Sequence, residues 1–404
     1  MKKYTWIPAF AGMTMLGLLF SVPCFAGIDG GYKDGLYIQT QDEKYKLIFN
    51  VWAQPQLQFL SISNQGNVNT FQIRRARLSF SGHAFTKDFT YRIEPEVIQG
   101  RTFTVSPGFN YGGVNLQDGW GTYKLRPWLQ FQMGQFKAYF NREELTATSQ
   151  LQMIDYSLTN EIFSYHRDMG AAIKGIFWDN KFEYAFNVMN DGTHRNATNK
   201  NNMFLFSGRL VYNVLGFHGY TMGDLDYLGY SESALSGGGK PQLALGVASS
   251  YDKVRETQTS PNHHTTATTC DIAYRFSGLS FFGAGYYFHN LSQGNKTWGF
   301  IGQSGYFLIP KHLEVAARYA GALPTAQNVP SGYEVGAGLN YFFFGHNLKL
   351  QADYNWLVNS PLTYGANGNP GVDSPSNIVT TGGNPGFHQG QHDHQVRLQF
   401  QFYL

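Results

Sequence analysis

The sequence has little cysteine, little charge and no long apolar run. Its 404 residues include two cysteines, Cys24 and Cys270. The first lies in an N-terminal segment that we expect to be removed, so no internal disulfide can form, and small disulfide-stapled domains are excluded. Charged residues make up 14% of the chain, whereas about 25% is usual in soluble domains. No stretch approaches the roughly 18 apolar residues of a membrane helix, and the mean hydropathy of −0.31 also argues against a helical membrane protein.

The first 26 residues have the three parts of an export signal. Lys2 and Lys3 are followed by an apolar stretch, Met13–Val22, and by Cys24-Phe25-Ala26 as a cleavage site. We therefore predict a signal peptide over residues 1–26 and an N-terminal periplasmic segment over 27–44. Cleavage removes two lysines and no acidic residue, so the formal net charge falls from +3 to +1. A charge this close to zero argues against a nucleic-acid partner.

Aromatic residues and strict alternation are what the chain has in abundance. Aromatic side chains reach 16% of the sequence. In the last ten residues Val396, Leu398 and Phe400 share one face of a strand, and Arg397 lies on the other with several glutamines. Similar segments of about ten residues, the length of a tilted strand that crosses a bilayer, recur along the chain. This pattern is typical of an outer-membrane β-barrel.

Residues 45–404 contain sixteen such segments, from Tyr45–Phe59 to His394–Leu404. An even number is usual in bacterial single-chain barrels. We therefore predict an all-β fold, a 16-stranded antiparallel transmembrane β-barrel in which the last strand pairs with the first. The long connection Val214–Lys240 leaves an alternative of 18 strands, with an extra hairpin in Phe217–Tyr230.

Local signals refine this topology. Tight turns are predicted at Asp179-Asn180, Ser277-Gly278 and Pro310-Lys311, and we place them on the periplasmic side. The alternation slips by one residue at Arg74-Arg75, which predicts a β-bulge there.

The third external loop, residues 137–168, differs from the other loops. It carries apolar residues that must be buried, and the inner wall of the barrel is the nearest cover. We therefore expect this loop to fold into the lumen as a constriction, with a packed surface flap as the alternative. Its charged residues give a net of minus two: Lys137, Arg142 and Arg167 against Glu143, Glu144, Asp155, Glu161 and Asp168.

Alternation also assigns charged side chains to the inner face of the barrel. On the lipid face an Arg or Lys at the midplane costs about 2–4 kcal/mol. The predicted pore-lining basic residues are Arg75, Arg77, Arg92, Lys174, Arg209, Arg275, Arg318, Lys349 and Arg397, and the acidic ones are Glu94, Glu96, Glu183, Asp271, Glu314, Glu334 and Asp353. Two hypotheses remain open. The set is either a basic ladder that guides anions such as phosphate, or a mixed wall whose ion pairs stabilise the barrel.

No catalytic motif is present, and we expect neither an enzyme nor a cofactor. The adjacent pair Glu143-Glu144 does not by itself place two carboxylates on one substrate. His392 and His394, with Asp393 and His388 nearby, are possible metal ligands, but their glycine-rich context argues against a preformed site. We therefore predict no metal site.

Several segments together resemble the phosphate-selective porin O and P family. They are Phe71–Gly82 with Phe89–Arg92, Leu116–Trp120, Gln132–Lys137, Arg142–Leu145, His166–Gly170, Phe182–Gly192 and the final Arg397–Leu404. The resemblance implies a trimeric, 16-stranded outer-membrane porin with an infolded third loop that lets small anions diffuse passively.

The expected function is therefore a diffusion porin of the bacterial outer membrane, either general or anion-preferring. Its expected partners are small hydrophilic solutes or anions, outer-membrane lipid and two further copies of the chain in a homotrimer. The alternative is a barrel that acts mainly as an adhesin or a structural surface protein through its external loops.

Overall fold

The computed structural model describes residues 27–33, 35–63, 66–99, 114–190, 199, 203–216, 241–254, 263–360 and 389–404. The predicted signal peptide, the alternative hairpin at Phe217–Tyr230 and most of the loop Val358–Asp393 lie outside these residues.

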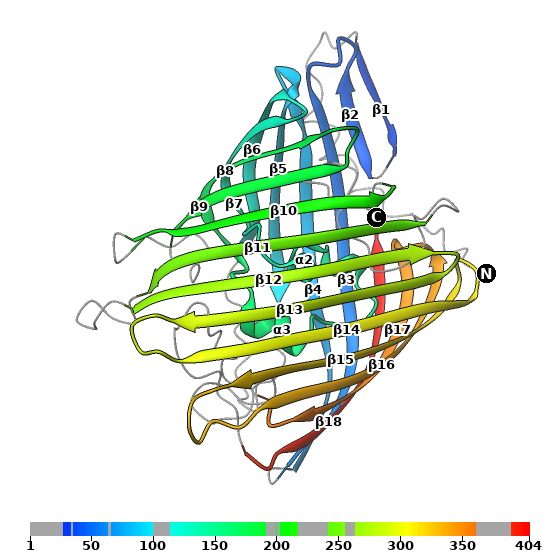
Figure 1. The fold of residues 1–404 in the computed structure, drawn as a ribbon. Helices are drawn as coiled ribbons and strands as arrows, with labels where there is room; N and C mark the ends of the chain where they lie inside the picture. Colours follow the sequence, from blue (N-terminus) through cyan, green and yellow to red (C-terminus); the bar gives the residue numbers. More distant parts are fainter. Residues whose placement is uncertain are drawn as a thin grey trace, which may run out of the picture.

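The described chain forms a closed antiparallel barrel, and this confirms the predicted fold class (Figure 1). Each strand pairs with its neighbour in sequence, and the last pairs with the first. The sixteen barrel strands are β3 (Lys46–Ile62), β4 (Gly66–Ala84), β5 (Thr86–Gln99), β6 (Asn115–Arg126), β7 (Leu129–Lys137), β8 (Arg167–Phe177), β9 (Phe182–Met189), β10 (Leu205–Leu215), β11 (Gln242–Val254), β12 (His263–Phe276), β13 (Leu279–Asn290), β14 (Lys296–Ile309), β15 (Leu313–Pro324), β16 (Gly332–Phe344), β17 (Leu348–Val358) and β18 (His392–Tyr403).

The contact between β18 and β3 closes the barrel. Val396 lies opposite Phe59 and Leu398 opposite Leu57. At the end of the chain the backbone N–H of Leu404 donates to the carbonyl of Val51 (2.8 Å), and the N–H of Val51 donates back (3.1 Å). Closure leaves no open strand edge in the barrel wall, and an open edge cannot be satisfied in lipid.

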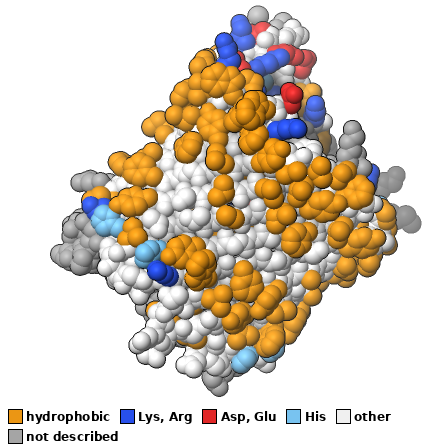
Figure 2. All heavy atoms as spheres, viewed as in Figure 1, with side chains coloured by type: hydrophobic (Ala, Val, Ile, Leu, Met, Phe, Trp, Pro, Cys, Tyr) orange, Lys and Arg blue, Asp and Glu red, His pale blue; other side chains and the backbone are white. Residues whose placement is uncertain are grey.

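The polarity of the wall is the reverse of that in a soluble protein. Along β18, Val396 is 47% exposed on the outer face, whereas the neighbouring Arg397 is 4% exposed on the inner face. Figure 2 shows apolar side chains over much of the outer wall, with charged side chains confined to its margins. An apolar outer belt around a polar interior suits lipid outside and water inside.

Two further strands precede the barrel, where only an N-terminal segment was expected. β1 (Ile28–Tyr32) and β2 (Leu36–Thr40) form an antiparallel hairpin, and β2 continues the sheet by pairing with the first residues of β3. The hairpin extends beyond one end of the barrel (Figure 1). Each strand has five residues and β1 is exposed throughout, so neither shows the long alternation by which the barrel strands were found.

The predicted tight turns are confirmed. Ser277 and Gly278 both have positive φ angles, 48° and 86°, which matches the turn type that favours two-residue hairpins. Asp179 and Asn180 also have positive φ angles, and so does Lys311.

The predicted β-bulge is also present. Arg75 lies opposite Gln54 and Ile73 opposite Pro55, so Arg74 is the extra residue. Pro55 has no N–H to donate to the ladder, and such residues are tolerated at bulges.

Residues 138–166 connect β7 to β8 and contain three short helices. These are α2 (Arg142–Leu145), the 3₁₀ helix η1 (Thr148–Gln150) and α3 (Leu158–Phe163). The side chain of Asn141 accepts from the N–H of Glu143 to cap α2. The described residues include no helix long and apolar enough to span a membrane. The predicted loop boundaries were slightly too wide, because Lys137 and Arg167 are the last and first residues of the flanking strands.

Candidate functional site

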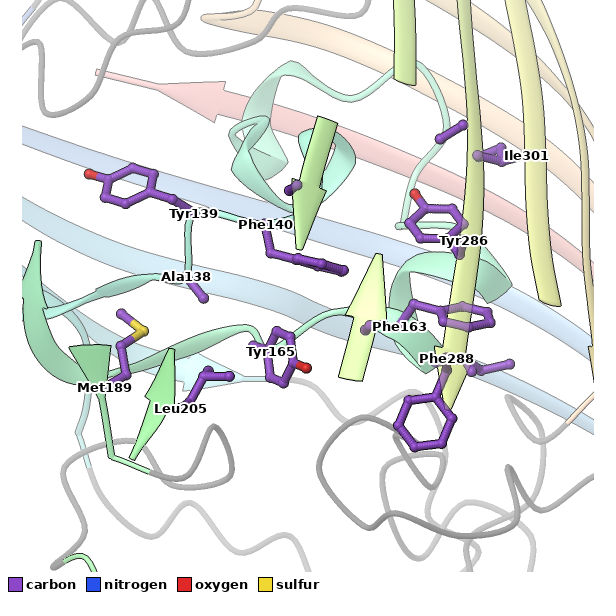
Figure 3. Close-up of a cluster of buried hydrophobic side chains, with 14 of the residues drawn as sticks. Ala138, Tyr139, Phe140, Phe163, Tyr165, Met189, Leu205, Tyr286, Phe288 and Ile301 are labelled. Carbon is purple, nitrogen blue, oxygen red and sulfur yellow. The ribbon is translucent and has the colours of Figure 1, made fainter. Parts of the chain in front are cut away.

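One side of the segment 138–166 is apolar and packs against a wall of small residues. Leu158, Ile162 and Phe163 are fully buried, as the apolar character of the loop required. They belong to a cluster with alanines from the inner face of the barrel, among them Ala320 and Ala322. Figure 3 shows Phe163 beside Tyr286, and these two rings stack at 5.1 Å between centroids. Burial of one such side chain contributes about 1.5–3 kcal/mol.

Glycines of the inner wall make room for individual side chains of this segment. A Cβ atom at Gly299 would lie 2.4 Å from the ring of Phe163. A Cβ atom at Gly305 would lie 2.0 Å from the side-chain nitrogen of Gln152. Sequence reasoning missed these positions, because glycines in a strand give no sign of the side chain that will occupy the space.

Polar groups of the wall hold the other part of the segment. The Gln152 side chain donates to Ser280 and to Glu314, both at 2.7 Å. The N–H of Ile154 donates to Asp353 (3.1 Å), and the N–H of Leu158 donates to Glu334 (2.7 Å). The Lys349 ammonium donates to the carbonyl of Leu151 (3.1 Å). Four residues predicted as pore-lining charges, Glu314, Glu334, Lys349 and Asp353, therefore bind the segment.

Asp155 is the point where the segment meets the arginines of β4 and β18. Its carboxylate accepts from Arg74 (3.2 Å), Arg75 (2.5 Å) and Arg397 (3.1 Å). Arg397 also donates to Asp353 at 2.8 and 2.6 Å. We call these five residues the Asp155 cluster. The bulge explains why two consecutive residues, Arg74 and Arg75, reach the same carboxylate.

The electrostatics of the Asp155 cluster favour the ionised carboxylate. Burial alone would raise the pKa of Asp155, but Arg74, Arg75 and Arg397 outweigh that effect and hold the pKa well below its ordinary range. The cluster therefore contains three arginines and two carboxylates, an excess of one positive charge.

A second group of ion pairs, the Asp118 cluster, lies on β4, β5, β6 and the start of β8. Arg77 donates to Glu96 (2.8 Å) and contacts Glu94 (3.2 Å). Arg167 donates to Asp118 at 2.9 and 3.3 Å. Arg92 pairs with Glu94 and lies 3.6 Å from Asp118. The members of this cluster are Arg77, Arg92, Glu94, Glu96, Asp118 and Arg167.

The remaining predicted basic residues are also buried on the inner face. Arg209 and Arg142 share the carboxylate of Asp271, each at 2.6 Å. Arg318 pairs with Glu334. Lys174 donates to the hydroxyl of Tyr139 (3.0 Å), and Arg275 is 4% exposed. Arg77, Arg92, Arg209, Arg318 and Arg397 therefore form ion pairs within the barrel wall. The pore-lining role of the nine basic residues stays a prediction.

The adjacent carboxylates Glu143 and Glu144 have different partners. Glu143 accepts from the N–H and the hydroxyl of Ser157 at 2.7 and 2.6 Å. Glu144 accepts from Asn160 (2.9 Å) and pairs with His166 (3.2 Å). Burial would raise the pKa of Glu144, but His166 and Lys137 lower it on balance. His166 was not among the predicted site residues. It is the last residue of the segment and has a φ angle of 52°.

Of the histidines considered as metal ligands, His388 lies outside the described residues, and His392 and His394 have separate aromatic partners. His392 and His394 point outward on β18, whereas Asp393 between them is buried on the inner face. His394 bonds to the hydroxyl of Tyr354 (2.7 Å), and His392 stacks on Trp356. Within the part of the chain that the structure describes, no group of three or more His, Cys, Asp or Glu side chains is suited to a metal ion.

A closed sixteen-stranded barrel with an apolar outer wall, a polar interior and a buried segment after its fifth strand defines an outer-membrane porin. The family model described as phosphate-selective porin O and P matches residues 49–222. This match, together with the porin fold, supports an outer-membrane channel for small solutes. A comparison with curated protein sequences found no match.

Solved porin structures share the fold at low sequence identity. The anion-selective porin from Comamonas acidovorans has a TM-score of 0.58 at 11% identity, covering 89% of this chain and 100% of that one. OmpF of Salmonella typhi in complex with daunomycin has a TM-score of 0.57 at 13% identity, with coverage of 93% and 100%. OmpT of Vibrio cholerae has a TM-score of 0.53 at 12% identity, with coverage of 89% and 98%.

Proposed function

We propose that the segment 138–166 is folded into the lumen and forms the constriction of the channel. Its attachments support this placement, because they reach inward-facing residues on β12, β13 and β15–β18 as well as on β4. A surface flap, the alternative considered above, would not bind inner-face side chains on β4 and also on the strands that end with β18.

The exposure of the ion-paired side chains supports a position for the open part of the lumen. Among the described residues, five of these side chains are between 11% and 31% exposed, whereas the other ion-paired side chains of the interior are at most 8% exposed. The exposed five are Arg74, Arg92, Asp118, Asp155 and His166. We place the solute path along these residues, between the segment and strands β4–β6.

We propose a modest preference for anions, with phosphate among the permeant ions. The observation that carries this proposal is the convergence of Arg74, Arg75 and Arg397 on Asp155, which leaves one excess positive charge beside the path. Arginine and lysine at a constriction favour anions. The preference is modest because carboxylates accompany the arginines in both clusters.

We also propose that the channel is a homotrimer. The resemblance of residues 49–222 to the porin family supports this state, and one structure of Vibrio cholerae OmpT, which shares the fold, is described as a trimer form.

The test of this function is electrical. The refolded protein is inserted into planar bilayers, and the single-channel conductance and the reversal potential in a KCl gradient are measured. We expect an aqueous conductance with a slight preference for chloride. Asp155→Asn should increase that preference. Asp42→Asn, in the exposed turn between β2 and β3, is the matched control and should leave it unchanged. Absence of conductance would refute the channel, and a preference for potassium would refute the anion proposal.

A further inference from the structure

The outer face of β11–β14 carries a basic patch at the end of the barrel opposite the tight turn Ser277-Gly278. Lys253, His264, His289 and Lys296 all alternate with buried inward residues, so their side chains lie on the outer face. We call these four residues the outer basic patch. Figure 2 shows basic and histidine side chains gathered at the corresponding ends of these strands, beside a wall that otherwise lacks charge.

Strand register brings the four residues together. Lys253 lies opposite His264, and His289 lies opposite Lys296. His289 also lies opposite Thr266, which is two residues from His264 on the same face. Directly opposed residues have Cβ atoms about 4.5–5.5 Å apart, and diagonal neighbours lie about 7–8 Å apart. The patch therefore spans four adjacent strands over a width similar to that of a lipid headgroup.

Aromatic side chains accompany the patch on its membrane side. Tyr287 packs against Trp298 at 4.5 Å between ring centroids and lies beside His289. The hydroxyl of Tyr251 contacts Nδ1 of His264, so a ligand would approach this imidazole at Nε2. Tyrosine and tryptophan mark the boundary between hydrocarbon and headgroups in membrane proteins. The outer basic patch thus lies at the height where lipid headgroups meet the barrel.

In the described parts of β11–β14, the charged side chains on this outer face are all basic. The acidic residues of the described parts of β11–β14 are Asp252 and Asp271, and both are buried on the inner face. A cationic patch placed at headgroup height and bordered by aromatic rings fits an anionic headgroup.

The geometry points to a binding site for the phosphate groups of an outer-leaflet glycolipid on the outer basic patch. This site is separate from the channel and goes beyond the proposed transport function. The phosphates of the lipid would bind Lys253 and Lys296 and accept hydrogen bonds from the two imidazoles, while its acyl chains follow the apolar wall below.

The experiment compares lipid retention by the purified, detergent-solubilised protein in native mass spectrometry. The probes are a bis-phosphorylated diglucosamine glycolipid and the same lipid with its phosphates removed. The wild type should retain the phosphorylated lipid selectively. Lys253→Gln/Lys296→Gln should weaken retention about tenfold or more. Lys253→Arg/Lys296→Arg should preserve it, which shows that the loss does not arise from misfolding.

The matched control is Lys124→Gln/Lys311→Gln, which removes two exposed lysines from the opposite end of the barrel and should retain the lipid. The proposal is overturned by any of three results. These are equal retention by Lys253→Gln/Lys296→Gln, equal retention of the phosphate-free lipid, and displacement of the lipid by millimolar inorganic phosphate. A patch that instead forms a contact between copies would reveal itself by dissociation of the oligomer in this variant. Single-channel conductance should be unchanged in every variant, so failure here is distinct from failure of the channel.

Discussion

The Nη2 atom of Arg75 lies 2.5 Å from Oδ1 of Asp155 and joins the barrel wall to the segment 138–166. This ion pair is one of three that Asp155 makes with arginines, and two of those arginines are adjacent in sequence because of the bulge in β4. The attachment of the segment to the arginines of β4 and β18 therefore depends on one carboxylate.

Acidification should release the segment at Asp155. The pKa of Asp155 is held well below its ordinary value of 3.8, so its ionised form stabilises the folded state. That contribution is complete above about pH 4 and is lost as the pH falls below it, toward the folded pKa. We expect single-channel current to become noisier as the pH falls from 4 to 2. In Asp155→Asn the noise should be present already at pH 7 and change less with pH. A wild-type trace that is equally quiet at pH 7 and pH 2 would contradict this prediction.

Gly299→Ala should displace the segment without changing charge. The added Cβ would lie 2.4 Å from the ring of Phe163, so α3 must move. Overpacking of this kind costs typically 1–3 kcal/mol. Gly302→Ala is the control. Gly302 lies on the same strand as Gly299, and a Cβ atom there would have no neighbour within 4 Å. We expect faster proteolysis within residues 138–166 and an altered conductance in Gly299→Ala. Identical behaviour of the two variants would show that Phe163 does not hold the segment.

The sequence predicted the barrel well because one physical rule, the alternation of polar and apolar side chains, applies to every strand. It placed Arg397 inside and Val396 outside without knowledge of any contact. The partners of Asp155 could not be predicted in this way, since Arg75 is 80 residues away and Arg397 is 242 residues away. Alternation also assigns Arg77 and Arg92 to the same face. It does not show that Arg77 is enclosed by two carboxylates whereas Arg92 keeps contact with solvent.

Asp271→Asn should destabilise the barrel more than the replacement of all three ion-paired residues, Arg142, Arg209 and Asp271, by apolar ones. The change would leave the guanidinium groups of Arg142 and Arg209 buried without their shared carboxylate. Breaking a buried pair in this way costs about 3–5 kcal/mol. The triple variant Arg142→Met/Arg209→Met/Asp271→Leu should recover part of that loss, because it removes the uncompensated charges as well. Unfolding by urea in lipid vesicles measures both values. A triple variant less stable than Asp271→Asn would contradict the prediction.

Leu398→Arg tests whether the outer face of β18, the closing strand, contacts lipid, because it should lower the free energy of unfolding in vesicles. Leu398 is exposed on the outer wall opposite Leu57, well within β18. An arginine at the bilayer midplane costs about 2–4 kcal/mol, and the cost falls to about 0–1 kcal/mol near the headgroups. His394→Arg is the matched control, since His394 lies on the same face of the same strand near its beginning, beside Tyr354. We expect a large loss of the free energy of unfolding in vesicles for Leu398→Arg and almost none for His394→Arg. Equal losses would mean that these two residues do not lie at different depths, and the membrane placement of β18 would have to be revised.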